Sequence, residues 1–153
     1  MHVLIATDGS EPSIVAARRA TELLCTADHI TLLTVVTEIP GDDAGGFAGS
    51  VYSPEEQDRV WDAELAEAGR ELQQTASAIQ GVHVDKRIEA GDAANSITSV
   101  AEKIGAAVIV VGSHGKTGFK RFVLGSVSEH VVRHAPCPVL VVRELPPAED
   151  HAE

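Results

Sequence analysis

The chain has 153 residues, of which 44% are hydrophobic and 23% charged, and it carries a net charge of −11. These values suit one globular domain with a sizeable core, and they argue against a general nucleic-acid binder, which would present a basic surface. No apolar run approaches the about 20 residues of a membrane span. The first residues, MHVLIATDGSEP, lack the basic start of a signal peptide. We therefore expect a cytoplasmic protein whose cysteines, Cys25 and Cys137, stay reduced.

Apolar runs predict five strands that alternate with helices. The strands are expected over residues 2–7, 30–36, 82–89, 107–111 and 139–142. Helices are expected to begin near Ser10, at Ser53-Pro54, after Asp92 and at Ser126. This alternation predicts an α/β fold, a single-domain, doubly wound (Rossmann-like) five-stranded parallel sheet with four helices.

Helical spacing also predicts which side chains of the first two helices face the core. In the first helix these are Val15, Ala16, Ala20, Leu23 and Leu24, and in the second Trp61 is expected to pack in the core. The glycine-rich residues 37–52 are expected to form a long mobile loop. The polar residues 144–153 predict an acidic flexible tail, so the domain itself should span residues 1–143.

Basic residues gather in one part of this acidic chain. From Lys103 to Arg143 there are six basic residues and one acid, Glu129, so this segment carries +5 and the remainder −16. Such a segment indicates either a site for an anionic ligand or a chance fluctuation on solvated loops, and charge alone does not decide between them.

The expected fold also predicts where a ligand would bind. In doubly wound sheets, ligands lie beyond the carboxyl ends of the strands, where the strand order reverses. With the common five-strand order, this point brings the turn after Thr7 close to the loop after Gly112. The Gly-Lys-Thr at 115–117 is not a P-loop, because that pattern needs a glycine at position 110, which is Val110.

A different phosphate site fits the same loop. Gly112 and Gly115 follow a buried strand, and Gly125-Ser126 opens a helix. Glycines allow positive φ and close approach of backbone amides, and a helix N-terminus favours an anion. The hydroxyls of Ser126 and Ser128 can add hydrogen bonds. Together these features favour phosphate binding.

The spacing Gly112-x2-Gly115-x9-Gly125-Ser126 resembles the ATP-binding signature of the universal stress protein family. The resemblance covers nearly the whole chain, including 4-LIATDGSE-11, 32-LLTVV-36 and 90-AGDAANSI-97. Its most specific part is 110-VVGSHGKTGFKRFVLGSVSEHVVRHAPCPVLVVR-143. It implies that ATP binds at the switch point. Mg²⁺ is expected to accompany the nucleotide because triphosphates carry this ion.

The site residues that this resemblance implies can be matched one at a time. Thr7 and Asp8 stand at the nucleoside, Val35 at the adenine, Val111 and Gly112 beside the ribose and phosphates, His114 and Gly115 in the phosphate loop, and Gly125, Ser126, Val127 and Ser128 at the phosphates. The resemblance also implies a homodimer made through the last strand, Val139–Val142.

These features predict a nucleotide-dependent regulator or sensor in stress response. No catalytic nucleophile–base pair or metal cluster is visible in the sequence, so at most slow ATP hydrolysis is expected. His130 and His134 have metal-ligand spacing, but H-V-V-R-H departs from H-E-x-x-H, and a structural or surface role is expected. Two alternatives stay open. One is a nucleotide-hydrolysing or nucleotidyl-transfer enzyme, in which residues 37–52 would form the pocket for a second substrate. The other is a nucleotide-free module that binds a protein partner.

Overall fold

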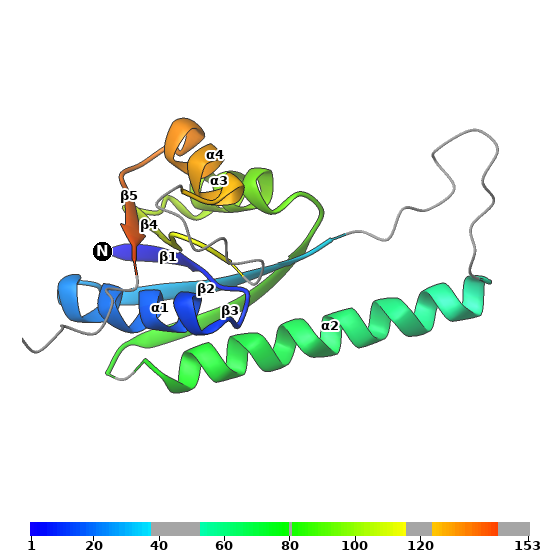
Figure 1. The fold of residues 1–153 in the computed structure, drawn as a ribbon. Helices are drawn as coiled ribbons and strands as arrows, with labels where there is room; N and C mark the ends of the chain where they lie inside the picture. Colours follow the sequence, from blue (N-terminus) through cyan, green and yellow to red (C-terminus); the bar gives the residue numbers. More distant parts are fainter. Residues whose placement is uncertain (38–52, 80, 116–123, 144–153) are drawn as a thin grey trace, which may run out of the picture.

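The computed structural model describes residues 1–37, 53–79, 81–115 and 124–143. Most of the predicted loop at 37–52 and the whole predicted tail lie outside the described residues. Strands and helices alternate along the chain (Figure 1). They are β1 (His2–Ala6), α1 (Glu11–Leu23), β2 (His29–Val36), α2 (Pro54–Ser77), β3 (His83–Ala90), α3 (Ala93–Ile104), β4 (Val108–Gly112), α4 (Ser126–His134) and β5 (Val139–Val142).

The five strands form one sheet in the order β3-β2-β1-β4-β5, and every pairing is parallel. The chain builds outward from β1 through β2 to β3 and then returns to the other side of β1 for β4 and β5. The strand order therefore reverses between β1 and β4, which is the predicted switch point. The predicted α/β fold class is confirmed.

The sheet is covered on both faces, with α1 and α2 on one side and α3 and α4 on the other (Figure 1). Successive side chains of β1 point to opposite faces, so Val3 and Ile5 join the core under α1 and α2, whereas Leu4 joins the core under α3 and α4. Leu4 and Ile5 are fully buried. Two apolar layers thus hold the carboxyl ends of the central strands in place.

The predicted apolar face of α1 is partly wrong. The buried residues are Ser13, Ile14, Ala16, Ala17 and Ala20, whereas Leu23 is 65% exposed. The buried stripe continues from Ala20 to Leu24, which packs against the core one turn later. Leu23 precedes Leu24 by one residue, about 100° around the helix axis, and so faces solvent.

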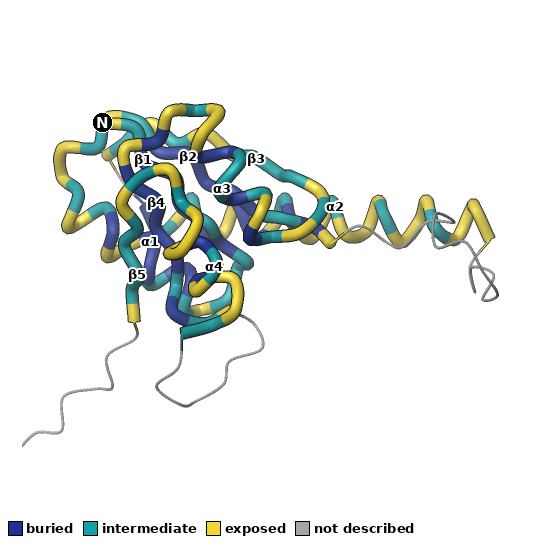
Figure 2. The backbone as a smooth tube through the Cα atoms, turned by 90° about the horizontal axis from the view of Figure 1, so that it is seen from above, coloured by how far each residue is buried: buried dark blue, intermediate teal, exposed yellow. Residues whose placement is uncertain are grey.

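The helix α2 begins at the predicted capping box. The Glu56 N–H donates to Ser53 Oγ (3.3 Å), and the Ser53 N–H donates to a Glu56 carboxylate oxygen (2.7 Å). All buried residues of α2 lie from Ala68 onward, and the N-terminal half extends beyond the sheet (Figure 2). Trp61, in that half, is only half-buried and belongs to neither core cluster, so the expected core packing is wrong.

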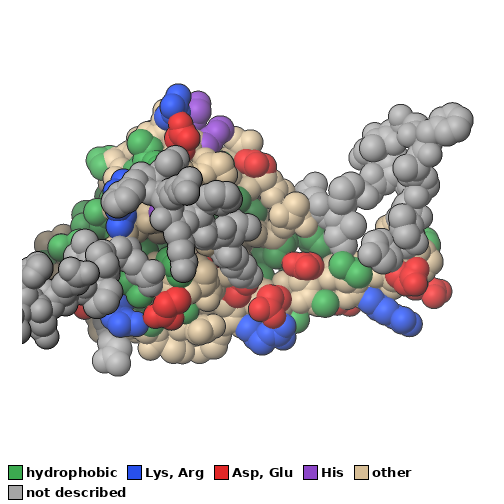
Figure 3. Space-filling view, viewed as in Figure 1, with side chains coloured by type: hydrophobic (Ala, Val, Ile, Leu, Met, Phe, Trp, Pro, Cys, Tyr) green, Lys and Arg blue, Asp and Glu red, His purple; other side chains and the backbone are tan. Residues whose placement is uncertain are grey.

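Charged side chains lie along α2 in the space-filling view (Figure 3). Among the described residues, no helix combines the length and the apolar character needed to cross a bilayer.

Candidate functional site

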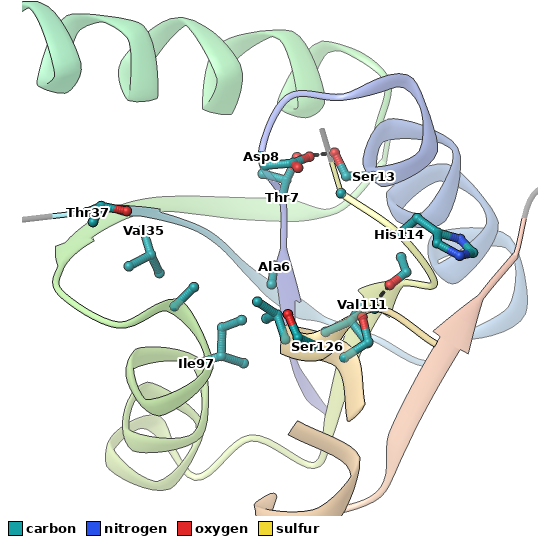
Figure 4. A pocket seen from close by; sticks show the side chains of 16 residues that line it. Ala6, Thr7, Asp8, Ser13, Val35, Thr37, Ile97, Val111, His114 and Ser126 are labelled. Atoms are coloured by element: carbon teal, nitrogen blue, oxygen red, sulfur yellow. Dashed lines mark hydrogen bonds between the residues drawn. The ribbon is translucent and has the colours of Figure 1, made fainter. Parts of the chain in front are cut away.

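A cavity of about 440 Å³ opens at the carboxyl ends of β1, β2 and β4, against α3 and the start of α4 (Figure 4). Every residue predicted for the site lines it: Thr7, Asp8, Val35, Val111, Gly112, His114, Gly115, Gly125, Ser126, Val127 and Ser128. Five lining residues were not predicted: Ala6, Ser13, Thr37, Ala93 and Ile97. The residues named from four separate stretches of sequence therefore meet in one place.

One wall of the cavity is apolar. Ala6 is the last residue of β1 and Val35 the last but one of β2, both on the face that packs against α3, and Val111 lies on the same face in β4. Ala93 and Ile97 close this wall from the first turns of α3, one turn apart. Such a wall can hold a flat apolar group such as a base. Ile97 is also a buried residue of the core, and helical periodicity can indicate only that role, so periodicity alone could not reveal its place at the cavity.

Asp8 is positioned by the turn that leads from β1 into α1. Its Oδ1 accepts hydrogen bonds from the Ser10 N–H (3.1 Å) and the Ser10 hydroxyl (2.5 Å). Ser10 occupies the N-cap position of α1 as predicted, but it makes no side-chain cap hydrogen bond, because its hydroxyl is turned back to Asp8. The side chain of Ser10 therefore orients the Asp8 carboxylate at the cavity.

Thr7 contributes to the cavity differently from Asp8. Its hydroxyl is hydrogen-bonded to Ser13 Oγ and Thr75 Oγ1, both at 2.9 Å, and its side chain is buried. The Thr7 carbonyl accepts a hydrogen bond from the Thr34 hydroxyl (2.9 Å). Because these bonds tie β1 to α1, α2 and β2, Thr7 anchors the turn beside the cavity.

The glycines of the loop act by close approach, and the predicted use of positive φ is wrong for them. The described glycines with positive φ are Gly9, Gly81, Gly91 and Gly105. A Cβ on Gly115 would lie 2.7 Å from Asp8 Oδ2, one on Gly112 3.2 Å from the His114 carbonyl oxygen, and one on Gly125 3.3 Å from the Ser113 carbonyl oxygen. Each glycine thus lets two backbone segments, or a backbone and Asp8, approach more closely than a side chain would permit.

The start of α4 presents backbone donors to the cavity. Gly125 is the N-cap and provides no side-chain cap, and its own N–H donates to the Ser113 carbonyl (2.9 Å). The N–H groups of Ser126, Val127 and Ser128 belong to the first turn, where a helix offers no acceptors, and the helix dipole adds partial positive charge there. This arrangement can bind an anion.

The two serines of this turn play different parts. Ser126 is exposed at the cavity mouth. The hydroxyl of Ser128 is buried and donates to the Gly112 carbonyl (2.7 Å), which ties α4 to the end of β4. The predicted donation from Ser128 to a ligand is therefore not available in this arrangement, and the residue instead holds the helix start in position.

His114 lines the cavity mainly through its backbone. Its Nδ1 is 3.0 Å from Ser113 Oγ, and its ring points away from Ala6 and Val35 (Figure 4). Nε2 is buried and has no hydrogen-bond partner among the described residues. An imidazole that faces away from the cavity orients the loop and does not itself supply a cation to a ligand.

The basic segment contributes little side-chain charge to the cavity within the described chain. Lys103, Arg133 and Arg143 do not line it, and Arg133 is paired with Glu129 (2.7 Å). The other basic residues of the segment, at 116, 120 and 121, lie outside the described residues. Within the described chain, backbone amides supply the positive potential at the cavity.

A second cavity of about 380 Å³ adjoins the first and shares Asp8, Val35 and Thr37 with it. Its other side is formed by α2, which contributes Glu64, Glu67 and Glu71. Carboxylates disfavour a phosphate nearby, so the anionic part of a ligand is directed to the glycine loop and α4. The two cavities together are acidic at one end and rich in amide donors at the other.

The fold and this cavity define the class of the protein, an open α/β protein with a cavity at the topological switch point. The chain matches the model of the Universal stress protein family over residues 1–143, and it belongs to this family. It is 36% identical over 148 residues to a universal stress protein of Methanocaldococcus jannaschii, an alignment that covers 93% of this chain and 81% of the relative.

Solved structures share the fold. The universal stress protein UspA from Lactobacillus plantarum superposes with a TM-score of 0.73 at 24% identity, over 94% of this chain and 97% of that one. A universal stress protein family protein from Arabidopsis thaliana, solved with AMP bound, superposes with a TM-score of 0.64 at 22% identity, over 97% of both chains.

Proposed function

We propose that this chain is an ATP-binding universal stress protein that acts as a nucleotide-dependent regulator or sensor in stress response. The observation that carries the proposal is the switch-point cavity. It combines an apolar wall, a positioned carboxylate and a set of uncapped amides in one space. These three elements correspond to the base, the ribose hydroxyls and the phosphates of a nucleotide.

The chain's own residues fit each part of such a ligand. Val35, Ala6 and Ile97 would hold the adenine, and the Asp8 carboxylate would accept hydrogen bonds from ribose hydroxyls. The amides of Gly115 and of residues 126–128 would hold the phosphates. The close approaches at Gly112, Gly115 and Gly125 support this fit, because they let the loop, Asp8 and the start of α4 come together around one cavity.

The choice of a triphosphate rests on the length of the donor array. Amides are offered both by the loop at Gly115 and by the first turn of α4, which favours a ligand with several phosphate groups. The AMP bound by the Arabidopsis protein supports an adenine nucleotide in this fold. Mg²⁺ would accompany the triphosphate and neutralise part of its charge.

We propose binding and not dedicated catalysis. Asp8 is the carboxylate common to both cavities, and two hydrogen bonds from Ser10 fix its Oδ1 in place. A strong ATPase needs a positioned base and a metal-binding acid near the γ-phosphate, whereas Asp8 is proposed to bind the ribose hydroxyls.

The second, acidic cavity favours one alternative, an enzyme that transfers the nucleotidyl or phosphoryl group to a substrate held against α2.

We further propose that the protein is a cytoplasmic homodimer whose domain spans residues 1–143. The strand β5 lies at an edge of the sheet and pairs with β4 on one side. Its four residues, Val139–Val142, are apolar and half-buried. Pairing of two such edges would cover them. Sedimentation at micromolar concentration tests this, and a monomer there would exclude the dimer.

The nucleotide carried by the purified protein tests the main proposal. Mass spectrometry of the material released on denaturation should identify ATP, and calorimetry on the emptied protein should show 1:1 ATP binding. Release of AMP with pyrophosphate formation and turnover would support the enzyme instead. Absence of measurable affinity for ATP and AMP in the folded protein would exclude both and favour a module that binds only a protein partner.

A further inference from the structure

Three histidines stand side by side at the amino ends of adjacent strands. In the sheet register, His2 of β1 pairs with His29 of β2, and His29 pairs with His83 of β3. Neighbouring strands lie about 4.8 Å apart, and paired residues point to the same face, so the rings meet. The ring centroids are 4.3 Å apart for His2 and His29 and 5.0 Å apart for His29 and His83.

A carboxylate joins this row. Asp85 lies two residues after His83 on the same face of β3. Its Oδ2 is 2.7 Å from His29 Nε2, and its Oδ1 is 3.2 Å from His83 Nε2. One nitrogen of each of these two histidines and one oxygen of Asp85 all lie within 4.8 Å of one another.

We propose that His29, His83 and Asp85 form a binding site for a divalent transition metal ion of the Zn²⁺ type. Two imidazole nitrogens and one carboxylate oxygen are a donor set that such ions prefer. In a tetrahedral site with ligands at about 2.0–2.1 Å, neighbouring ligand atoms are separated by about 3.3 Å. The three ligand atoms already lie within 4.8 Å of one another, and side-chain rotations would bring each pair to this separation.

The surroundings of the site suit a metal taken from solution. The side chains of His29, Asp85 and His83 are 37%, 55% and 68% exposed, so the ion can reach them and a water molecule can fill a fourth position. His2 packs against His29, and its own Nε2 is hydrogen-bonded to Thr31 Oγ1 (2.8 Å). His2 thereby limits the rotation of the His29 ring, as outer-shell partners do in metal sites.

The site is separate from the proposed nucleotide cavity. It lies at the amino ends of β2 and β3, whereas the cavity lies at the carboxyl ends of the strands (Figure 1). Because it joins two strands, a bound ion would cross-link the start of β2 to the start of β3.

The chain offers a matched control in His130 and His134 on α4. Their rings lie 4.2 Å apart at helical i, i+4 spacing, which is also compatible with a metal. However, His134 Nδ1 is 2.9 Å from the His130 carbonyl oxygen, and no third metal-binding side chain among the described residues completes a group with them. Figure 3 shows histidine side chains at the molecular surface over α4.

Zinc titration of the tag-free, chelator-treated full chain tests the proposal. Calorimetry should show one Zn²⁺ per chain for the wild type and for the His130→Ala/His134→Ala variant. The His83→Ala/Asp85→Ala variant should bind more than about 100-fold more weakly, because two direct ligands are lost and loss of outer partners alone costs about 10–100-fold. Circular dichroism and ATP binding serve to confirm that each variant is folded.

A second measurement keeps the test decisive if one variant folds poorly. Zn²⁺ should raise the melting temperature of the wild type and of the α4 variant, because it binds only the folded state that brings β2 and β3 together. The conservative variant Asp85→Asn should lose this rise. No zinc binding by the wild type, binding unchanged in the His83→Ala/Asp85→Ala variant, or loss only in the α4 variant would each overturn the proposal.

Discussion

The Gly115→Val variant tests the proposed phosphate loop most directly. A Cβ at this position would lie 2.7 Å from Asp8 Oδ2, below the 3.0 Å that real Cβ atoms keep. To reach an ordinary contact of about 3.5–4.0 Å, the loop and the carboxylate must separate by on the order of 1 Å. Asp8 cannot yield freely, because its Oδ1 is held by the backbone and the hydroxyl of Ser10.

The size of the effect follows from the hydrogen bonds at risk. A hydrogen bond to a charged group contributes about 1.5–3 kcal/mol, and about 1.4 kcal/mol corresponds to a tenfold change in affinity. Displacement of one phosphate-binding amide therefore weakens ATP binding about 10- to 150-fold, and displacement of Asp8 as well weakens it further.

Calorimetry with ATP measures this change, and Gly69→Val is the matched control. Gly69 lies in α2, and a Cβ there would meet nothing within 4 Å. The control should bind ATP like the wild type. A folded Gly115→Val protein with unchanged ATP affinity would refute the assignment of the loop to the phosphates.

Three further variants test the turn at Gly9, the attachment of α4 through Ser128 and the role of His2 at the amino ends of the strands. Gly9→Ala should lower the free energy of unfolding by at least about 1–2 kcal/mol in urea, because φ is +70° and the new Cβ would lie 2.5 Å from Glu71 Cγ; an unchanged midpoint would contradict this. Ser128→Ala should cost about 1 kcal/mol and weaken ATP binding, because α4 loses its bond to Gly112; a loss of stability with full affinity would show that the bond does not position the donors. Burial, and next the charge of His29, lower the pKa of His2 in the folded protein below its ordinary value of 6.5. The stability that neutral His2 contributes is therefore present above about pH 6.5. It is lost as the pH falls through the lowered pKa of the folded state. In a chelating buffer, His2→Asn should therefore flatten the decline of melting temperature below about pH 6.5, and parallel curves would exclude this role.

The sheet and its switch point could be predicted because they depend on strong local patterns. The run at 107–111 is apolar throughout, as expected for a strand covered on both faces, and four of the five residues of β4 are buried. The start of α3 at Asp92 was also predictable, because Asp is a preferred N-cap residue. In the structure its side chain accepts the Asn95 N–H at 2.9 Å. Patterns of this kind need no knowledge of the rest of the molecule.

Other features depend on contacts that local patterns do not contain. The Ser10 hydroxyl could cap α1 or bond to Asp8, and only the geometry of the turn decides. Leu23 and Trp61 fit apolar helical spacing, but Leu23 lies about 100° around α1 from the core-facing Leu24, and Trp61 lies in the half of α2 that extends beyond the sheet. Ala93 and Ile97 line the cavity because α3 begins beside the end of β2, which no spacing within α3 could indicate.

The uneven anchoring of α2 has a consequence for how this helix opens. Its 24 residues would span about 36 Å at 1.5 Å per residue, but its buried residues begin only at Ala68. Short openings of a helix cost little where few side chains are buried, so protection against hydrogen exchange should rise along α2 from its capped start to its buried end. Glu64 and Glu67, which face the second cavity, lie just before the point where burial begins. Glu64 and Glu67 therefore form the part of this cavity wall that opens more easily, whereas Ala68 and Glu71, which are buried, form its better protected part.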